Sequence, residues 1–312
     1  MRAVFMGTPA FAVPTLAALV NAGHGVELVI TQPDRPVGRK QTLTPPPVKV
    51  KALELGLEVF QPRRIKSADS FERLAAIAPD VIVVVGYGQI IPQRILDLPP
   101  LGCINVHASL LPKYRGAAPI NWAVANGEIS TGVTTMRIIF KLDAGDMLLK
   151  RETAIGPAET AEELFERLAP IGADLLVETL AGLEGGSITP QPQVDEEATF
   201  APILRREDGE IDWSVGASQI YDRLRGFTPW PGLYTYFRGR RLEIHGAQPL
   251  DQAGPKPGAI ATANGQFGVG CGEASMLAID EVQPEGKKRM AAADFVRGYR
   301  PTEGEILGEN KK

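Results

Sequence analysis

Hydrophobic residues in the first part of the chain form short continuous runs, with helical patterns between them. Val81–Val85 is an unbroken run of branched aliphatic residues, and two further β-type runs occupy Ala3–Met6 and Val26–Thr31. Continuous runs are typical of parallel strands that are buried on both faces, because a half-exposed strand alternates polar and apolar residues. The stretch Phe11–Asn21 has helical spacing and follows the first run. This alternation of strand and helix predicts a doubly wound α/β sheet.

The pattern changes after residue 188. Residues 189–206 are polar and contain prolines, which is typical of a linker. Short β-type runs with Gly or Pro between them predict a small all-β, OB-like barrel next; these runs are Gly232–Phe237, Arg241–Ala247, Gly258–Ala263, Gly268–Cys271 and Met276–Val282. We therefore expect an α/β domain over 1–188, a linker over 189–206 and a β domain over 207–312.

Composition excludes several classes of protein. Of 312 residues, 44% are hydrophobic and 22% are charged, as in ordinary globular proteins. The two cysteines, Cys103 and Cys271, show no metal-ligand spacing, so we expect no metal. No apolar run is long enough to span a membrane, and the start lacks the apolar stretch of a signal peptide. We expect a cytoplasmic protein that does not bind membranes.

Charge is distributed unevenly along the chain. The formal net charge is −4, which argues against broad, non-specific binding to nucleic acid. Residues 205–312 carry 15 basic and 15 acidic residues, so the excess of negative charge lies in the first 204 residues. Five arginines stand close together in the balanced part, and they are either a solvated surface or a local site for phosphates: Arg223, Arg225, Arg238, Arg240 and Arg241.

Two segments carry candidate chemistry. Asn105 and His107 are two residues apart in a β-type run, so their side chains share one face of a strand. An amide donor and a titratable ring at a strand end can stabilise a developing oxyanion, although a hydrogen-bonded strand end looks the same in sequence. Asp143, in the turn-like segment Lys141–Asp146, could orient His107, or could simply be a turn residue.

Other enzyme signatures are missing from the sequence. The first strand is followed by a single glycine, Gly7, and not by the glycine fingerprint of dinucleotide-binding proteins, which makes an NAD-dependent enzyme a poor alternative. The sequence also contains no phosphate-binding P-loop and no G-x-S-x-G or H-E-x-x-H motif.

The chain resembles the folate-dependent formyltransferases in the stretch Asn105–Pro112, in Arg115-Gly116 and in Leu142–Asp146. Within that superfamily it looks like the methionyl-tRNA formyltransferases, in segments that extend over nearly the whole chain: Gly7–Pro9 with Phe11, Thr31–Arg39, Glu207–Trp213 and Phe227–Pro231. Two residues depart from the family pattern, because Lys141 stands where the family usually has Gly and Ala144 where it has Thr.

The resemblance implies a Rossmann-like formyltransferase domain, with 10-formyltetrahydrofolate as co-substrate. It implies that Asn105, His107 and Asp143 are catalytic. Asn105 and His107 would bind the tetrahedral oxyanion, while Asp143 would keep His107 charged and oriented and help a water to remove the ammonium proton. The folate would lie between two segments of the chain, contacting Gly86, Tyr87, Gln89, Ile91, Ser109, Leu110, Leu111 and Pro112.

The resemblance also implies that initiator methionyl-tRNA is the formyl acceptor. The segment Gln32–Pro47 is long for a connection between a strand and a helix and has no element of its own in the sequence pattern. We expect its basic residues Arg35, Arg39 and Lys40 to bind the tRNA, with the arginines of the β domain as a second contact. We expect the protein to be a monomer.

Alternatives to this function remain open from the sequence. Another 10-formyltetrahydrofolate enzyme, either a hydrolase or an amino-sugar formyltransferase, could share the catalytic residues and even the barrel. The basic loop distinguishes these in favour of tRNA. A non-catalytic RNA-binding protein is a further alternative, against which the intact set of Asn105, His107 and Asp143 argues.

Overall fold

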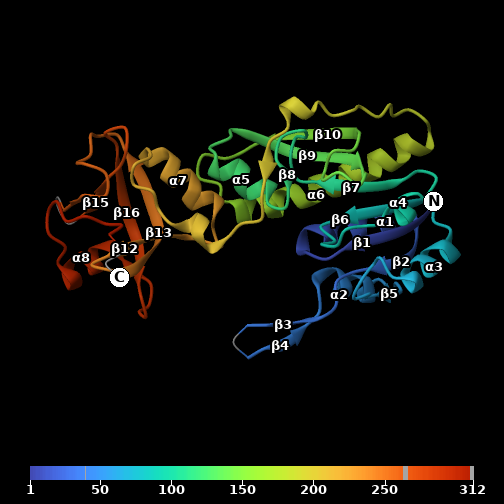
Figure 1. The fold of residues 1–312 in the computed structure, drawn as a ribbon, viewed down its shortest axis with the longest axis horizontal. Helices are drawn as coiled ribbons and strands as arrows, with labels where there is room; N and C mark the ends of the chain where they lie inside the picture. The colour runs from blue at the N-terminus through green and yellow to red at the C-terminus, as the bar shows by residue number, and fades with distance from the viewer. Residues whose placement is uncertain (39, 263–265, 310–312) are drawn as a thin grey trace. The chain divides into compact units, whose positions relative to one another are not determined.

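The computed structural model describes residues 1–38, 40–262 and 266–309 (Figure 1). Contacts divide the chain into two compact units, each assembled from three segments. The first unit contains Met1–Pro119, Ser130–Ala154 and Leu164–Ala201, and the second contains Ile120–Ile129, Ile155–Glu163 and Pro202–Lys312. Residues 189–201 of the predicted linker therefore belong to the first unit by their contacts.

Among the described residues, the first unit is built on a seven-stranded sheet with the order β10-β9-β7-β6-β1-β2-β5. Five strands from β5 to β7 are parallel, whereas β9 and β10 are antiparallel to their neighbours. The bounds are β1 Arg2–Gly7, β2 Gly25–Ile30, β5 Val59–Phe60, β6 Val81–Val85, β7 Cys103–His107, β9 Ser130–Arg137 and β10 Met147–Ala154. This confirms the predicted α/β fold with a Rossmann-like, mostly parallel sheet. β10 is a strand that the sequence pattern did not indicate.

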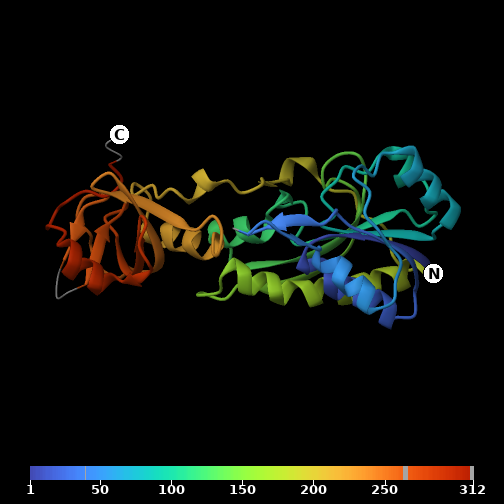
Figure 2. The same cartoon turned by 90° about the horizontal axis from the view of Figure 1, so that it is seen from below.

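Helices cover both faces of this sheet (Figure 2). One face carries η1 and α1, and α6 also lies there, because its Gly172 meets Val106 of β7 and Val133 of β9. The other face carries α3 and α4. The bounds are η1 Ala10–Ala12, α1 Val13–Asn21, α2 Pro47–Glu54, α3 Ala68–Ile77, α4 Gln93–Leu96, α6 Ala161–Glu184 and η2 Asp195–Glu197.

A proline within a helical pattern predicts a kink or a restart of the helix, and helix α6 contains such a residue, Pro170. The helix is continuous over Ala161–Glu184, with Pro170 inside it. Proline removes one backbone hydrogen bond and is unfavourable inside a helix. Buried leucines on both sides of it, Leu164 and Leu168 before and Leu175 and Leu176 after, anchor the helix and offset that cost.

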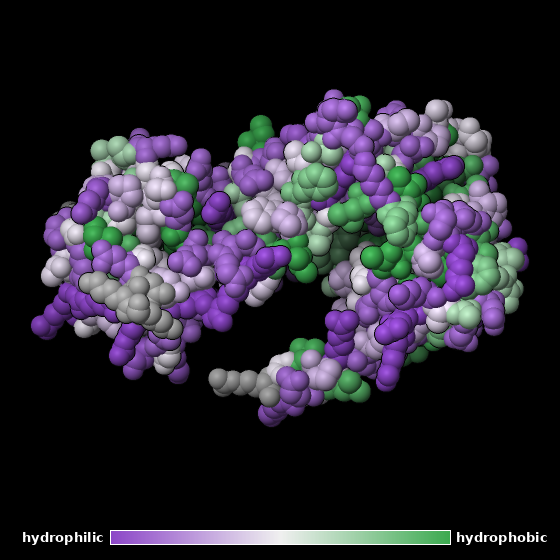
Figure 3. All heavy atoms as spheres, viewed as in Figure 1, coloured by the Kyte–Doolittle hydropathy of each residue, from purple (hydrophilic) through white to green (hydrophobic). Residues whose placement is uncertain are grey.

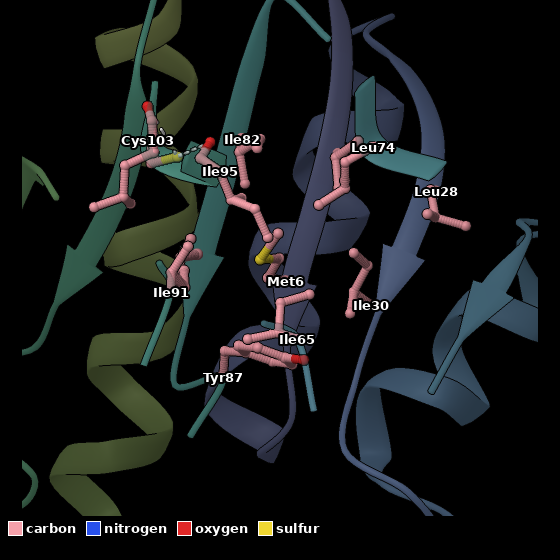
Figure 4. Packing of buried hydrophobic residues seen from close by; sticks show 13 residues of the cluster. Met6, Leu28, Ile30, Ile65, Leu74, Ile82, Tyr87, Ile91, Ile95 and Cys103 are labelled. Atoms are coloured by element: carbon pink, nitrogen blue, oxygen red, sulfur yellow. Dashed lines mark hydrogen bonds between the residues drawn. The ribbon is translucent and has the colours of Figure 1, made fainter. Parts of the chain in front are cut away.

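The core on the α3 and α4 face helps to explain why the runs in β1 and β6 contain no polar residue. Met6, Ile30 and Ile82 point from three parallel strands into one cluster with Leu74 of α3 and Ile95 of α4 (Figure 4). Full burial of side chains of this size contributes about 1.5–3 kcal/mol each. The same cluster contains Ile30, the last residue of β2, and Val84, near the end of β6, so the core extends to the edge of the sheet where the candidate site lies.

The segment after β2 contains a β-hairpin, so the expectation of a long connection without elements of its own was wrong. β3, Arg35–Val37, pairs antiparallel with β4, Thr42–Thr44. The sequence does not show the hairpin because both strands are three residues long and fully exposed, and so have no buried face to produce alternation. Val37 and Leu43 are exposed, so the surface of the hairpin carries both hydrophobic and hydrophilic residues (Figure 3).

The second unit contains a curled antiparallel sheet whose described strands follow the order β12-β13-β16-β15-β14, with β17 beside β16. The strands are β12 Leu233–Phe237, β13 Arg240–Leu250, β14 Ile260–Ala261, β15 Phe267–Gly270, β16 Met276–Pro284 and β17 Met290–Ala291. The helices are α7 Ala217–Gly226, α8 Ala292–Tyr299, η3 Arg206–Gly209 and most of α5, Pro119–Ala125. The antiparallel β sheet predicted for this region is confirmed, but the region also contains helices and so is not all-β.

Candidate active site

Strand β7 positions two of the predicted residues at the carboxyl edge of the parallel sheet. Asn105 is half-buried and His107 is 5% exposed, and both face the same side as Cys103, whose thiol approaches the carbonyl of Ile95 in α4. Val106 points to the opposite face, against α6. Alternation along the strand thus fixes the directions of both polar side chains. Within the described residues, the Asn105 side-chain amide has no hydrogen-bond partner, so it remains available to a ligand.

The His107 ring has different neighbours at its two nitrogens. Nε2 lies 2.9 Å from the carbonyl oxygen of Tyr114. A carbonyl only accepts hydrogen bonds, so Nε2 carries a proton and donates. Nδ1 lies 3.8 Å from Oδ2 of Asp143, which is too far for a direct hydrogen bond but close enough for electrostatic interaction. Nδ1 is therefore the nitrogen that can exchange a proton or donate to a ligand.

Asp143 reaches the ring from the loop between β9 and β10. Its backbone φ is 44°, in the left-handed region that non-glycine residues rarely adopt. Its Oδ2 accepts a hydrogen bond of 2.9 Å from the backbone N–H of Gly116, and the carboxylate is mostly buried. The structure thus brings Asn105, His107 and Asp143 together although 38 residues separate the first from the last.

Segment β8, Arg115–Gly116, lies between the histidine and the aspartate. It pairs in parallel with β11, Phe200–Ala201. Gly116 has φ of 123°, and a Cβ there would lie 2.6 Å from the carbonyl oxygen of Ala201. Only glycine fits that close approach. The same peptide supplies the N–H that holds Asp143, so this local geometry is part of the site.

The predicted folate residues Ser109–Pro112 form a tightly bonded turn after β7. Ser109 Oγ donates to the carbonyl of Lys113 at 2.7 Å, and the backbone N–H of Leu111 donates to Thr134 Oγ1 at 3.1 Å. Ser109 and Leu111 are buried, the latter against Met136, whereas Leu110 and Pro112 are half-buried. Leu110 and Pro112 are therefore the members of this turn that expose side-chain surface.

The second predicted folate segment directs its side chains mainly into the protein. Tyr87 and Ile91 are 2% and 7% exposed and belong to the core cluster shown in Figure 4, and burial raises the pKa of the Tyr87 hydroxyl. Gln89 accepts from the backbone N–H of Ile65 at 2.8 Å. Gly86 is exposed with φ of 57°. Gly86 thus leaves its peptide exposed, while the side chains of Tyr87, Gln89 and Ile91 are engaged within the protein.

Arg35 and Lys40, two of the residues predicted to contact tRNA, lie on the hairpin. Arg35 is exposed and weakly bonded to Gln32 at 3.4 Å, and Lys40 is exposed at the turn. Arg39 lies outside the described residues. In the second unit, Arg225 is buried and donates to the carbonyl of Glu159, and Arg238 donates to Glu305. Those two arginines are thus engaged within their own unit.

Sequence reasoning missed a set of side chains around the Asp143 loop. Gln193 donates to the carbonyls of Asp143 and Gly145, and its Oε1 accepts from Nε of Arg115. Asp195 bonds both Arg115 and Lys141. These contacts join residues that are about 50 to 80 positions apart, so they leave no local pattern in the sequence. Only Arg115, in the Arg115-Gly116 motif, indicated this part of the site.

Comparison with known proteins assigns the chain to a family. The family described as formyl transferase matches residues 1–180, and its C-terminal domain matches residues 203–300. The chain belongs to the formyltransferase family. It is similar over 99% of its length to formyltransferases named methionyl-tRNA formyltransferase from Solibacter usitatus (58% identity, 99% of that protein) and Koribacter versatilis (57% identity, 99% of that protein).

Two solved structures share the fold at much lower identity. An N-formyltransferase from Helicobacter canadensis, in complex with folinic acid and dTDP-3-aminofucose, matches with a TM-score of 0.67 at 16% identity, covering 90% of this chain and 98% of that one. HypX from Aquifex aeolicus, in complex with tetrahydrofolic acid, matches with a TM-score of 0.61 at 18% identity, covering 95% and 47%. Among the described helices of this formyltransferase, none is long and apolar enough to cross a membrane.

Proposed function

We infer that this protein transfers the formyl group of 10-formyltetrahydrofolate to the free amino group of initiator methionyl-tRNA. The observation that carries the choice of acceptor is identity of 57–58%, over essentially the full length of both chains, to proteins named for that reaction. The solved formyltransferases that act on sugars are similar to this chain at only 16–19% identity. A folate as formyl donor agrees with the folate compounds bound in two of the solved structures, that of HypX and that of the Helicobacter canadensis N-formyltransferase.

The arrangement at the end of β7 supports a mechanism in which the methionine amine attacks the formyl carbon. The carbonyl oxygen becomes an oxyanion, which the Asn105 amide can stabilise by donating to it. His107 has its Nε2 proton committed to Tyr114, so Nδ1 donates to the oxyanion only when the ring is protonated. The Asp143 carboxylate, 3.8 Å from Nδ1, stabilises that charged ring.

Proton removal from the attacking amine falls to the same carboxylate. An ammonium must lose its proton before nitrogen can form the new C–N bond, and a second proton leaves once that bond exists. Asp143 Oδ2 already accepts from Gly116, which leaves its other oxygen for a water that carries the proton away. Collapse of the oxyanion then breaks the bond between the formyl carbon and N10 of the folate, which takes up a proton as it leaves.

Folate binding and tRNA binding are assigned to separate surfaces in this proposal. The exposed peptide at Gly86, with Leu110 and Pro112, offers backbone polar groups and apolar side chains for a pterin ring. The hairpin, with Arg35, Arg39 and Lys40, supplies positive charge for phosphates. We propose a catalytic domain over 1–188 and a tRNA-binding domain over 207–312, in a protein that acts as a monomer.

A comparison of acceptors tests the function. The purified protein is incubated with 10-formyltetrahydrofolate and, in parallel, with methionyl-tRNA, a UDP-amino sugar or buffer alone, and loss of the formyl donor is measured. We expect transfer to methionyl-tRNA to exceed the other two rates by at least about 10³-fold, because binding energy from the tRNA is used at the reacting centre. Equal or faster transfer to the sugar or to water would replace this function with the corresponding alternative.

A further inference from the structure

Residues 191–201, here called the strap, connect two parts of the candidate site. At one end, the backbone of Gln191 exchanges two hydrogen bonds of 2.8 Å with Met147, the first residue of β10. At the other end, Thr199 accepts from the backbone N–H of Arg115 at 2.8 Å, and β11 pairs with β8. Both anchors lie in the first unit. The middle of the strap is thereby held beside the loop that carries Asp143.

Gln193 in the middle of the strap makes three hydrogen bonds with fixed polarity. Its Nε2 donates to the carbonyls of Asp143 and Gly145, each at 2.8 Å. Its Oε1 accepts from Nε of Arg115 at 2.9 Å. The two carbonyls can only accept and the guanidinium can only donate, so the amide has one chemically possible orientation. All the hydrogen-bonding capacity of this half-buried side chain, apart from one lone pair, is used on the site.

These hydrogen bonds are made to the part of the loop whose backbone conformation is least favourable. A left-handed residue other than glycine is unfavourable by roughly 1–2 kcal/mol unless its surroundings hold it. Gly145 is pressed against the backbone of Arg137, where a Cβ would lie 1.9 Å from the carbonyl oxygen. By bonding the carbonyls on both sides of Ala144, Gln193 fixes the peptide planes that direct the Asp143 side chain toward His107 and Gly116.

Arg115 extends the support to the other side of the site. Its guanidinium is 2% exposed, and such a buried charge needs a partner. It has one in Asp195, at 2.8 Å, which also pairs with Lys141 on the Asp143 loop. Arg115 immediately precedes the Gly116 peptide that binds the Asp143 carboxylate. Gln193 is therefore joined to Asp143 both through the loop backbone and through Arg115.

We propose that Gln193 is a positioning residue for Asp143, acting from a strap that sequence alone presents as a linker. It touches none of the reacting groups. Its amide holds the Asp143 peptide in the conformation that keeps the carboxylate beside Nδ1 of His107. The proposal rests on the proposed function and on the role of Asp143 in it, and it adds a residue that acts only through that aspartate.

The first test compares two leucine variants of the strap. Gln193→Leu keeps the shape of the side chain and removes its hydrogen bonds, while Gln191→Leu makes the same change at an exposed residue that is anchored through its backbone. We expect Gln193→Leu to lower kcat about tenfold with KM for both substrates within about twofold, since a small misplacement of a catalytic group mainly affects the transition state. Gln191→Leu should match wild type. Equal kcat for the two variants would overturn the proposal.

A double-mutant cycle separates positioning from a general structural role. Asp143→Asn is combined with Gln193→Leu, and single-turnover rates are measured with enzyme in excess. If Gln193 acts through Asp143, adding Gln193→Leu to Asp143→Asn lowers the rate by less than about twofold. A tenfold loss in both backgrounds would overturn the proposal, because Gln193 would then act independently of the aspartate. Asp143→Asn at the wild-type rate would also overturn it.

Hydrogen–deuterium exchange gives a readout that does not depend on activity. Gln193→Leu should speed exchange in peptides covering residues 138–146 and at Gly116, whereas Gln191→Leu should leave both unchanged. Unchanged exchange in Gln193→Leu would overturn the proposal. If the wild-type protein transferred no formyl group to methionyl-tRNA, the proposed function would fail, and exchange would still report whether Gln193 holds the loop.

Discussion

The end of strand β7 and the β9–β10 loop contribute to the same site by different means. Asn105 and His107 lie on a strand whose neighbours β6 and β9 are hydrogen-bonded to it in a fixed register. Asp143 lies in a loop, in a left-handed conformation, held by a peptide N–H and by a side chain 50 residues later in the chain. The strand is positioned by burial and backbone pairing, whereas the loop is positioned by a few polar contacts.

This difference indicates how each part tolerates change. Backbone pairing keeps the strand in place when one of its side chains is truncated, so such a variant reports mainly on the deleted group. A change in the loop or in the strap moves groups that remain chemically intact. The variants below test whether the strand end and the loop differ in this way.

The largest effect is expected on the strand. Asn105→Ala and His107→Ala each remove a donor to the oxyanion, and losing one such donor lowers kcat by about 10²–10³-fold. Folate affinity, measured by equilibrium binding, should stay within about threefold because the strand remains in place. Near-normal turnover in either variant would remove that residue from the mechanism, and a collapse of folate affinity would show that the strand end is not independent of binding.

An intermediate effect is expected in the loop from Gly145→Ala. The added Cβ would lie 1.9 Å from the carbonyl oxygen of Arg137, so the loop backbone must move. We expect stability to fall by about 1–3 kcal/mol and kcat by roughly tenfold or more, although no catalytic side chain changes. Gly298→Ala, where a Cβ meets open space in helix α8, is the matched control and should be neutral or slightly stabilising. Wild-type kcat in Gly145→Ala would show that the loop is not a constraint on Asp143.

The smallest effect concerns the pH dependence of stability at the strap. Hydrogen bonds from Lys141 and Arg115 lower the pKa of the Asp195 carboxyl in the folded protein. A lowered folded-state pKa adds stability above the unfolded-state value, near 3.9, and that stability is lost as pH falls through the folded-state value. Asp195→Asn should therefore be less stable than wild type at pH 7, with the gap closing below about pH 4.

Urea unfolding at several pH values measures this gap, with Glu196→Gln, an exposed neighbour, as the control. A gap that is the same at pH 7 and pH 3 would mean that the ion pairs of Asp195 do not stabilise the strap. In that case the loop would depend on Gln193 and on the Gly116 N–H, and its contrast with the strand would be sharper.

The parts of the molecule that sequence predicted are those with a strong local signal. The Val81–Val85 run became β6, and alternation along Cys103–His107 placed Asn105 and His107 on one face. The hairpin strands β3 and β4 have no buried face, so no alternation marks them in the sequence. Strand β10 was missed although its first residues are buried, because its later residues alternate only between half-buried and exposed.

The position of Asp143 beside His107 was anticipated from family resemblance rather than from spacing. Of the residues that hold it there, only Arg115 lies in a motif that the resemblance singled out. Gln193 is 78 residues from Arg115, and nothing in its local sequence distinguishes a half-buried glutamine with three hydrogen bonds from a polar linker residue. Side-chain contacts of that range follow from the completed fold and leave no periodic trace.

The contact between Lys141 and Asp195 has an evolutionary consequence. Lys141 stands at one of the two places where this chain departs from the usual pattern of its family, and its partner lies 54 residues away. A basic side chain at 141 therefore has this partner only while position 195 is acidic, whereas Asp195 keeps Arg115 as a partner if Lys141 is lost. We expect a dependence in one direction as the family diverged: a base at 141 should occur together with an acid at 195, while an acid at 195 should also occur without a base at 141.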